Sequence, residues 1–176
     1  GSPQLLPIQF ALWRFYFVRG AYQIAYEIAE QFTRVVHEVN DPLLLLPAHM
    51  APGMTFFRLG EFSTARGYLE KGIALYRQHK DQLSHFDTLL YSQDPGVMFH
   101  CYTAWTLAHL GYLDQALNRS QEALTLAHEL AHPVSIAFAL QFTATVHRFR
   151  GESRAAQEHA ETVLTLTHAF DTAGDH

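Results

Sequence analysis

The chain has 176 residues, of which 48% are apolar, and a formal net charge of -5 with 12 basic residues. This composition supplies a buried core and excludes wholesale disorder. The basic residues are scattered singly, so they form no electrostatic footprint for nucleic acid or for an anionic membrane surface. No apolar run approaches the roughly 18 residues that a membrane-spanning helix needs. The single cysteine, Cys101, cannot form an internal disulfide, which predicts a cytoplasmic protein.

The amino-terminal part predicts a linker followed by a first pair of helices. Residues 1–7 begin with Gly-Ser-Pro, which is typical of a tag remnant, so we expect the chain to be an excised piece of a longer protein. Residues 8–40 contain the strongly aromatic stretch Ile8–Val18, then Gly20 and apolar residues at three- and four-residue spacing. This pattern favours a helix, a tight corner and a second helix.

The second pair is expected over residues 42–78 and is followed by an insertion over residues 79–96. Pro42 suits the first turn of a helix, whereas Pro47 and Pro52 fall inside the same helix. Each interior proline removes a backbone donor and crowds the preceding turn, so we expect this helix to start late or to kink.

Two further pairs complete the predicted architecture. They are expected over residues 97–131 and 133–168, before a polar tail over residues 169–176. Eight main helices in four antiparallel pairs predict an all-α protein, a right-handed α-solenoid in which neighbouring pairs stack. We expect residues 8–168 to form a single domain.

Four corners share one sequence pattern. Their glycines are 40, 51 and 40 residues apart, a period typical of helical arrays. An alanine follows five residues after each glycine, where two helices must approach closely. A left-handed helix cap favours glycine, and a small residue permits close packing. The predicted structural repeat positions are Gly20, Ala25, Gly60, Ala65, Gly111, Ala116, Gly151 and Ala156.

The corners Leu59–Ala65 and Leu110–Ala116 resemble the tetratricopeptide repeat (TPR). Gly53 fits the small position in the first helix of that repeat, and Ala104 and Ala144 do the same in their own repeats. Trp13 occupies the equivalent position in the first repeat and departs from the pattern, so a non-standard amino-terminal edge is expected. The long 40-residue interval is similar to the variety found in bacterial regulators.

The segment Tyr91–Val97, together with Leu110–Leu117, looks like the repeat region downstream of NTPase modules in multidomain bacterial signalling proteins. Those proteins often carry a nucleotide-cyclase or kinase domain at the other end. The resemblance implies a sensory or scaffolding arm, and it transfers no catalytic residue to this chain.

The residues themselves offer little chemistry. There is no glycine-rich phosphate loop and no nucleophile elbow, so we expect no catalytic residue, no cofactor and no enzymatic activity. Among 12 histidines, the only pair four residues apart is His128 and His132. Surface or hydrogen-bonded histidines are the favoured interpretation, and a metal site at His128, Glu129 and His132 is the alternative. Cys101 is interpreted as a buried structural residue rather than a nucleophile.

In the resembling family, the first helix of each pair lines a concave groove, which implies a binding surface for a peptide or a partner domain. Aromatic, arginine and methionine side chains suit such a partner. The alternative is that these side chains pack against the insertion or against neighbouring helices. The groove residues carried over from the family are Phe10, Arg14, Phe17, Met50, Met54, Phe57, Arg58, Met98, Cys101, Trp105, His109, Phe138, Gln141 and Arg148.

The leading interpretation is therefore a non-catalytic protein-interaction and regulatory scaffold, whose partner is a peptide or another domain of the same polypeptide. A small-molecule sensor that regulates an attached NTPase or cyclase is one alternative. Self-association is the other, because Val163, Leu164 and Leu166 predict an exposed terminal helix that pairs with another copy as a homodimer.

Overall fold

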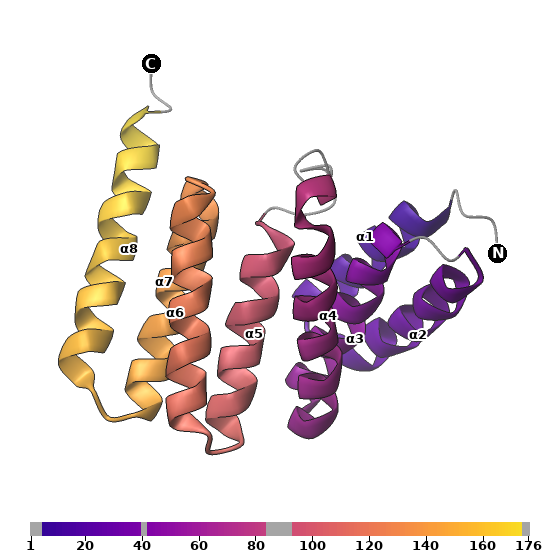
Figure 1. The fold of residues 1–176 in the computed structure, drawn as a ribbon, viewed down its shortest axis with the longest axis horizontal. Coiled ribbons are helices and arrows are strands. Elements are labelled where there is room, and N and C mark those ends of the chain that lie inside the picture. The colour runs from indigo at the N-terminus through magenta and orange to yellow at the C-terminus, as the bar shows by residue number, and fades with distance from the viewer. Residues whose placement is uncertain (1–4, 40–41, 84–92, 174–176) are drawn as a thin grey trace. The chain divides into compact units, whose positions relative to one another are not determined.

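The computed structural model describes residues 5–39, 42–83 and 93–173, which form eight α-helices and no strand. The helices are α1 (Leu6–Val18), α2 (Tyr22–Val39), α3 (Pro42–Leu59), α4 (Phe62–Leu83), α5 (Pro95–His109), α6 (Leu113–Glu129), α7 (Pro133–Phe149) and α8 (Ser153–Ala173). They gather into two compact units, residues 1–95 and 96–176, and each unit is described by itself (Figure 1). The single domain over residues 8–168 stays a prediction.

In the first unit, α1 pairs with α2 and α3 pairs with α4, while α2 also packs on α3. The aromatic rings of Phe10 and Trp13 stack with their centroids 5.1 Å apart, and the ring of Phe32 from α2 lies 5.9 Å from that of Phe10. Helix α1 begins at Leu6, whose side chain is only 2% exposed. The expected linker over residues 1–7 is therefore wrong at its end, because Leu6 belongs to the core.

Helix α3 runs from Pro42 to Leu59 with Pro47 and Pro52 inside it, so it does not start late, and the alternative of a kink stays a prediction. Pro42 occupies the first turn, where its missing N–H has no intrahelical acceptor to lose. Tertiary packing offsets the cost of the interior prolines, because both lie in the buried middle of the helix. At Gly53 the backbone approaches α4 so closely that an added Cβ would lie 3.0 Å from Leu69 Cδ2. This contact explains the small residue at that position.

Three helix ends differ from the predicted boundaries. Helix α4 continues past residue 78 to Leu83, and α5 begins at Pro95, so the segment between them is shorter than expected. Helix α8 continues past residue 168 to Ala173. The middle of the predicted insertion, residues 84–92, lies outside the described residues.

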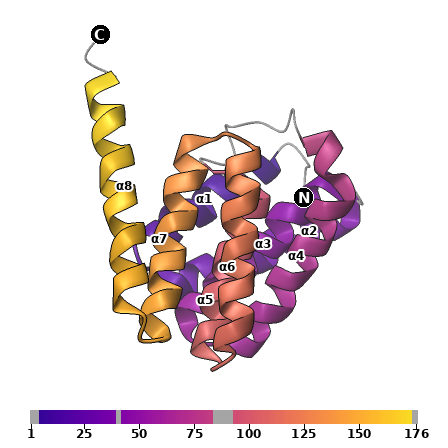
Figure 2. The same cartoon turned by 60° about the vertical axis from the view of Figure 1, so that its left-hand side comes forward.

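In the second unit, α6 packs on α7 and α7 packs on α8. A core cluster joins α5, α6 and α7, with Val146 of α7 completely buried among small and aliphatic residues. The other members of the cluster and the half-buried residues around it are Ala104, Leu107, Ala108, Ala116, Trp105, Leu113 and Leu117. Figures 1 and 2 both show α8 as the last helix of this unit, with α7 beside it.

The predicted corners are confirmed in their backbone geometry. Gly20, Gly60, Gly111 and Gly151 have φ values of 77°, 83°, 86° and 75°, which is the left-handed region. At the second corner the N–H of Gly60 donates to the carbonyl of Phe57, and the N–H of Glu61 donates to the carbonyl of Phe56. The other three corners repeat this pair of hydrogen bonds, the Schellman motif.

The alanine of each corner has an equally local role. Its N–H donates to the carbonyl of the residue directly after the glycine, as Ala65 does to Glu61 at 2.9 Å, and this bond closes the first turn of the next helix. The four alanines are between 0% and 7% exposed, so a larger side chain has no room.

The corner between α6 and α7 is built differently, because Ala131 carries a positive φ of 49° without being glycine. An alanine in this conformation costs about 1 kcal/mol.

We expect Ala131→Gly to stabilise the protein by up to about 1 kcal/mol, and Gly111→Ala to destabilise it by a similar amount. A Cβ at Gly111 would meet nothing within 4 Å, so backbone conformation alone sets that cost. Urea unfolding followed through Trp105 fluorescence in a Trp13→Phe background measures both, and shifts of the same sign would contradict the argument.

Candidate binding surfaces

In the first unit, the sequence-predicted groove residues meet along the seam between α1 and α3. The indole N–H of Trp13 donates to Thr55 Oγ1 at 2.9 Å, which ties the two helices together inside the core. About one helical turn further along the same two helices, the guanidinium carbon of Arg58 lies 5.6 Å from the ring centroid of Phe17, within cation–π range. Arg14 and Arg58 are exposed. This α1–α3 seam presents the guanidinium group of Arg58 beside an aromatic ring, with Arg14 exposed on α1.

In the second unit, the corresponding seam lies between α5 and α7. The rings of Trp105 and Phe142 stack with centroids 3.8 Å apart, and the indole N–H of Trp105 donates to the carbonyl of Phe142 at 3.1 Å. Further along, the ring of His109 lies 4.8 Å from that of Phe149, and both residues are exposed. The ring of Phe138 lies 4.5 Å from that of Phe142. This α5–α7 seam is an aromatic strip with a histidine at its end.

The structure divides the predicted groove residues by accessibility. Exposed side chains are Arg14, Arg58, His109, Gln141 and Arg148, and half-buried ones are Met98, Trp105 and Phe138. Buried side chains are Phe10, Phe17, Met50, Met54, Phe57 and Cys101.

The expected methionine-rich lining is therefore wrong for Met50 and Met54, which are 1% and 5% exposed. Phe10 and Phe17 point into the first unit's core, where Phe10 contacts Phe32. Burial also raises the pKa of the Cys101 thiol well above its usual range, so this thiol is not poised as a nucleophile.

Sequence reasoning missed the other side of α1. Leu5, Ile8, Leu12, Phe15 and Val18 are 49%, 62%, 44%, 52% and 81% exposed. They form one apolar side of the helix, here named the α1 stripe. The sequence did contain a signal for this second apolar side, because residues on all sides of α1 are mostly apolar. Such a pattern predicts a helix that packs against other elements on both sides.

A hollow of about 740 Å³ lies on the second unit between α7 and α8. Helix α7 contributes Gln141 and Arg148, and α8 contributes Ala160, Val163 and Leu164 among others. Its surface is mostly apolar, and Leu164 is 60% exposed. We refer to it as the α7–α8 hollow.

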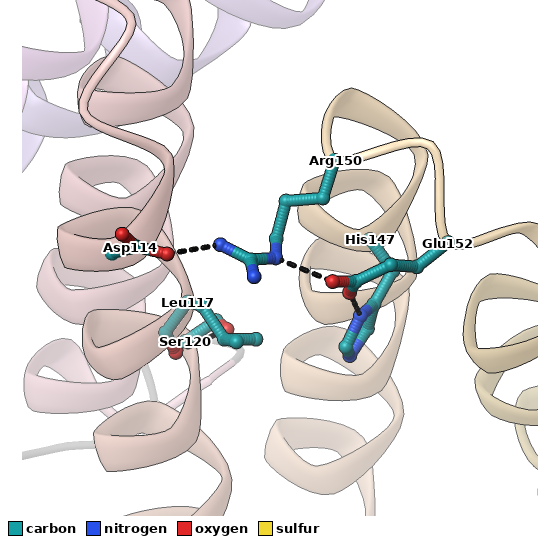
Figure 3. Close-up of polar contacts among 6 residues, drawn as sticks. All are labelled: Asp114, Leu117, Ser120, His147, Arg150 and Glu152. Carbon is teal, nitrogen blue, oxygen red and sulfur yellow. Dashed lines mark hydrogen bonds and ion pairs between the residues drawn. The ribbon is translucent and has the colours of Figure 1, made fainter.

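A chain of charged groups fixes the corner between α7 and α8 (Figure 3). His147 Nδ1 lies 2.6 Å from Glu152 Oε2, and Arg150 Nε donates to Glu152 Oε1 at 2.8 Å. Arg150 Nη1 also donates to Asp114 Oδ1 at 2.6 Å, which links this corner to the first turn of α6. The hydrogen bonds from His147 and Arg150 lower the pKa of Glu152, and those to Asp114 and Glu152 raise the pKa of Arg150. The network orients the fourth helix pair on the third.

Replacing Arg150 tests that role. We expect Arg150→Gln to lower the stability of the protein at neutral pH, and the loss to shrink at high salt. The pKa of Glu152 is lower in the folded protein than its ordinary value. The stability that the ionised carboxylate contributes is therefore complete above the ordinary pKa and is lost as the pH falls through the pKa of the folded state. The difference between wild type and variant should therefore narrow in acid. Arg154→Gln is the matched control, because Arg154 is 94% exposed on the side chain and pairs along its own helix with Glu158; an equal loss there would contradict the prediction.

The structure separates the histidines of the alternative metal site. Helix α6 ends at Glu129, so His128 and His132 do not share a helix face, and His132 Nδ1 lies 2.8 Å from Ser135 Oγ. Among the described residues, no group of three or more His, Cys, Asp or Glu side chains is placed to hold a metal ion. None of the helices in the described ranges has both the length and the apolar character that crossing a bilayer requires.

Comparison with known proteins supports the fold. No protein-family model matches the sequence, and no curated protein shows significant sequence similarity to it. One crystal structure of a kinesin-light-chain-like protein from Podosopora anserina, described as having nearly identical TPR-like repeats, superposes with a TM-score of 0.68. It is 18% identical, and the match covers 97% of this chain and 78% of that one.

Two other solved structures match over nearly their whole length with lower scores. A second structure of the Podosopora anserina protein is 16% identical with a TM-score of 0.43, covering 96% of this chain and 98% of that chain. The MamA RS-1 ArsTM double mutant is 17% identical with a TM-score of 0.39, covering 98% and 99%. The first match, together with the four glycine corners, shows that the chain has an all-α, TPR-like helical repeat fold.

Proposed function

We propose that this chain is a non-catalytic interaction and regulatory scaffold, part of a larger bacterial signalling protein, that binds a peptide or a partner domain. A TPR-like repeat fold is the usual setting for protein binding, and the observation that carries the proposal is the character of the two seams. The α1–α3 seam places the exposed guanidinium of Arg58 beside the ring of Phe17, and the α5–α7 seam places the exposed imidazole of His109 beside the ring of Phe149. Arginine and aromatic side chains dominate the binding energy at protein interfaces.

The two seams suit different ligand segments, and each is considered by itself. The α1–α3 seam suits an acidic segment, whose carboxylates would meet the guanidinium group of Arg58, and the α5–α7 seam suits an apolar segment, whose side chains would pack on Trp105 and Phe149. Half-buried Trp105 offers one face while its indole N–H stays bonded to Phe142. The rings are thus pre-organised, which reduces the entropy lost on binding.

A displayed library of random peptides tests the proposal. We expect acidic peptides whose affinity Arg58→Glu weakens about tenfold or more by calorimetry, and apolar peptides whose affinity His109→Glu weakens by a similar factor. Arg154→Glu, which changes an exposed arginine outside both seams, is the matched control and should leave the affinity unchanged. A library without binders, or binders that are insensitive to both seam variants, would overturn the proposal.

A small-molecule sensor is the second candidate, favoured by a hollow of about 370 Å³ between α2, α3 and α4 of the first unit. Its lining includes His37, His49 and Lys71 beside aliphatic side chains. His49 Nδ1 is buried and has no hydrogen-bond partner among the described residues. The ammonium group of Lys71 carries positive charge and the imidazole rings of His37 and His49 can donate hydrogen bonds, so the hollow suits a small organic acid or a phosphate ester.

Thermal melting with inorganic phosphate and with short-chain carboxylates tests this candidate at constant ionic strength. We expect at least one of these anions to raise the melting temperature, and Lys71→Met to abolish the shift. If sodium chloride at the same ionic strength raised the melting temperature equally, or Lys71→Met retained the full shift, no site of this kind would exist in the hollow.

A further inference from the structure

The helix pairs of the second unit show how one pair covers the next. Val146 of α7 is completely buried against α5 and α6, and Ala139 and Thr143 lie on the same side of α7, also completely buried. The face of α5 and α6 that receives α7 is formed by Ala104, Trp105, Leu107, Ala108, Leu113, Ala116 and Leu117. This packing is an internal example of a complete interface between consecutive repeats.

The α7–α8 hollow is the same receiving face one repeat later. The corner glycines Gly111 and Gly151 are 40 residues apart, so the two pairs can be aligned position by position. Six of the seven positions of the receiving face become Ala144, Thr145, Arg148, Ser153, Ala156 and Gln157, which line the hollow, while Leu107 becomes His147, which does not. In α5 and α6 these positions are covered by α7. In α7 and α8 no described helix covers them, and the space is an open hollow.

The α1 stripe is the matching incoming face. Aligning Gly20 with Gly151 places Ile8, Leu12 and Phe15 at the positions of Ala139, Thr143 and Val146. Those three α7 residues are all 0% exposed, whereas the three α1 residues are between 44% and 62% exposed. The chain thus carries both halves of its own repeat-to-repeat interface, one on α1 and one on α7 and α8, and none of the described helices covers either half.

We propose that these two surfaces bind each other between copies, so that α1 of one molecule occupies the α7–α8 hollow of the next. The contact is heterologous, because the two faces differ, so it joins copies head to tail, in a ring or in an open row. This inference goes beyond the proposed function and does not rest on it, since it concerns the α1 stripe and the α7–α8 hollow and not the two seams.

The charges near the contact give it a distinctive salt dependence. In the internal interface Arg150 bonds Asp114. The aligned residues in the contact between copies are Arg19 and Arg154, two like charges. Apolar burial therefore drives the association while these arginines oppose it, and added salt strengthens it by screening them.

Two variants with one blocked face each test the proposal on the full chain. Leu12→Glu blocks the α1 stripe and Leu164→Glu blocks the α7–α8 hollow, and both side chains are exposed enough for the fold to persist, which circular dichroism verifies. By sedimentation, wild-type protein should grow in mass with concentration, and each variant alone should associate at least about tenfold more weakly. Ile24→Glu, which alters a 44% exposed residue of α2 outside both faces, is the control and should assemble like wild type.

Mixing the two variants separates this arrangement from all others. Each variant retains the face that the other lacks, so an equimolar mixture should form a heterodimer that grows no further. A two-fold dimer through α8 would instead survive Leu12→Glu, and that result would overturn the proposal. The proposal would also be overturned if the wild-type protein were monomeric at every concentration, or if the mixture of the two variants stayed monomeric. Either result would indicate that the α7–α8 hollow binds a helix of another protein.

Discussion

Replacing Trp13 with alanine should cost about 3–5 kcal/mol of unfolding free energy, the range for removing a large aromatic side chain from a core. Trp13 is 2% exposed and contacts Phe10 and Phe17, with ring centroids 5.1 and 5.2 Å away. It also joins α1 to α3 through its bond to Thr55. The other first helices carry Gly53, Ala104 and Ala144 at this position, so Trp13 replaces a close backbone approach with a large side chain. Urea unfolding followed by circular dichroism measures the loss.

Two milder variants divide that cost between volume and hydrogen bonding. Trp13→Phe keeps much of the ring but removes the donor, and the Thr55 hydroxyl still donates to the carbonyl of Ala51 at 2.7 Å, so about 1–2 kcal/mol should be lost. Thr55→Val leaves the indole N–H buried without an acceptor and should cost about 1–3 kcal/mol. The double variant should cost less than the sum of the two. A loss below about 1 kcal/mol for Trp13→Ala would show that α1 contributes little to the core.

The corners could be predicted because their cause is local. A left-handed cap needs glycine wherever the chain turns between two helices of a pair, and Gly60 and Gly111 mark it in the sequence regardless of the rest of the fold. The corner at Ala131 also has a left-handed residue but no glycine, so the sequence carried no sign of its positive φ. The late start expected for the proline-containing helix α3 is wrong because tertiary packing outweighs the local penalty of the prolines.

The buried side of a first helix could not be predicted, because these helices are apolar on more than one side. In α1, Phe10 and Phe17 fit a groove as well as Phe15 and Ile8 do by residue type. Only the packing shows that the first two are buried and the second two exposed. Trp105 and Phe142 likewise stack from positions 37 residues apart, a contact that no periodicity reveals. The α7–α8 hollow depends on whether another helix packs above it, and a sequence pattern carries no such information.

The first unit should lose stability as the pH falls from about 6.5 towards 4, through His49. Burial, Lys71 and His37 lower the pKa of His49 from its ordinary value of 6.5 to about 4. The unfolded chain therefore takes up this proton at a higher pH than the folded chain. The stability that the neutral ring contributes is complete above pH 6.5 and declines until the folded pKa is reached. Because the ring is partly exposed, we expect a total loss of about 1–3 kcal/mol.

The two tryptophans allow this loss to be assigned to its unit, since Trp13 lies in the first and Trp105 in the second. In a Trp105→Phe background, Trp13 fluorescence follows urea unfolding of the first unit at several pH values between about 7.5 and 4.5, which span the titration of an imidazole. His49→Gln should flatten the slope of stability against pH, because it removes the titrating ring while keeping a polar side chain. His37→Gln should leave most of the slope, since His37 is exposed and only repels the charged form of His49.

An unchanged slope in His49→Gln would assign the acid sensitivity to carboxylates, whose protonation begins nearer their ordinary pKa values at about 4. The expected order of the three proteins, with the flattest slope for His49→Gln, follows from one buried imidazole whose Nδ1 atom lacks a hydrogen-bond partner among the described residues.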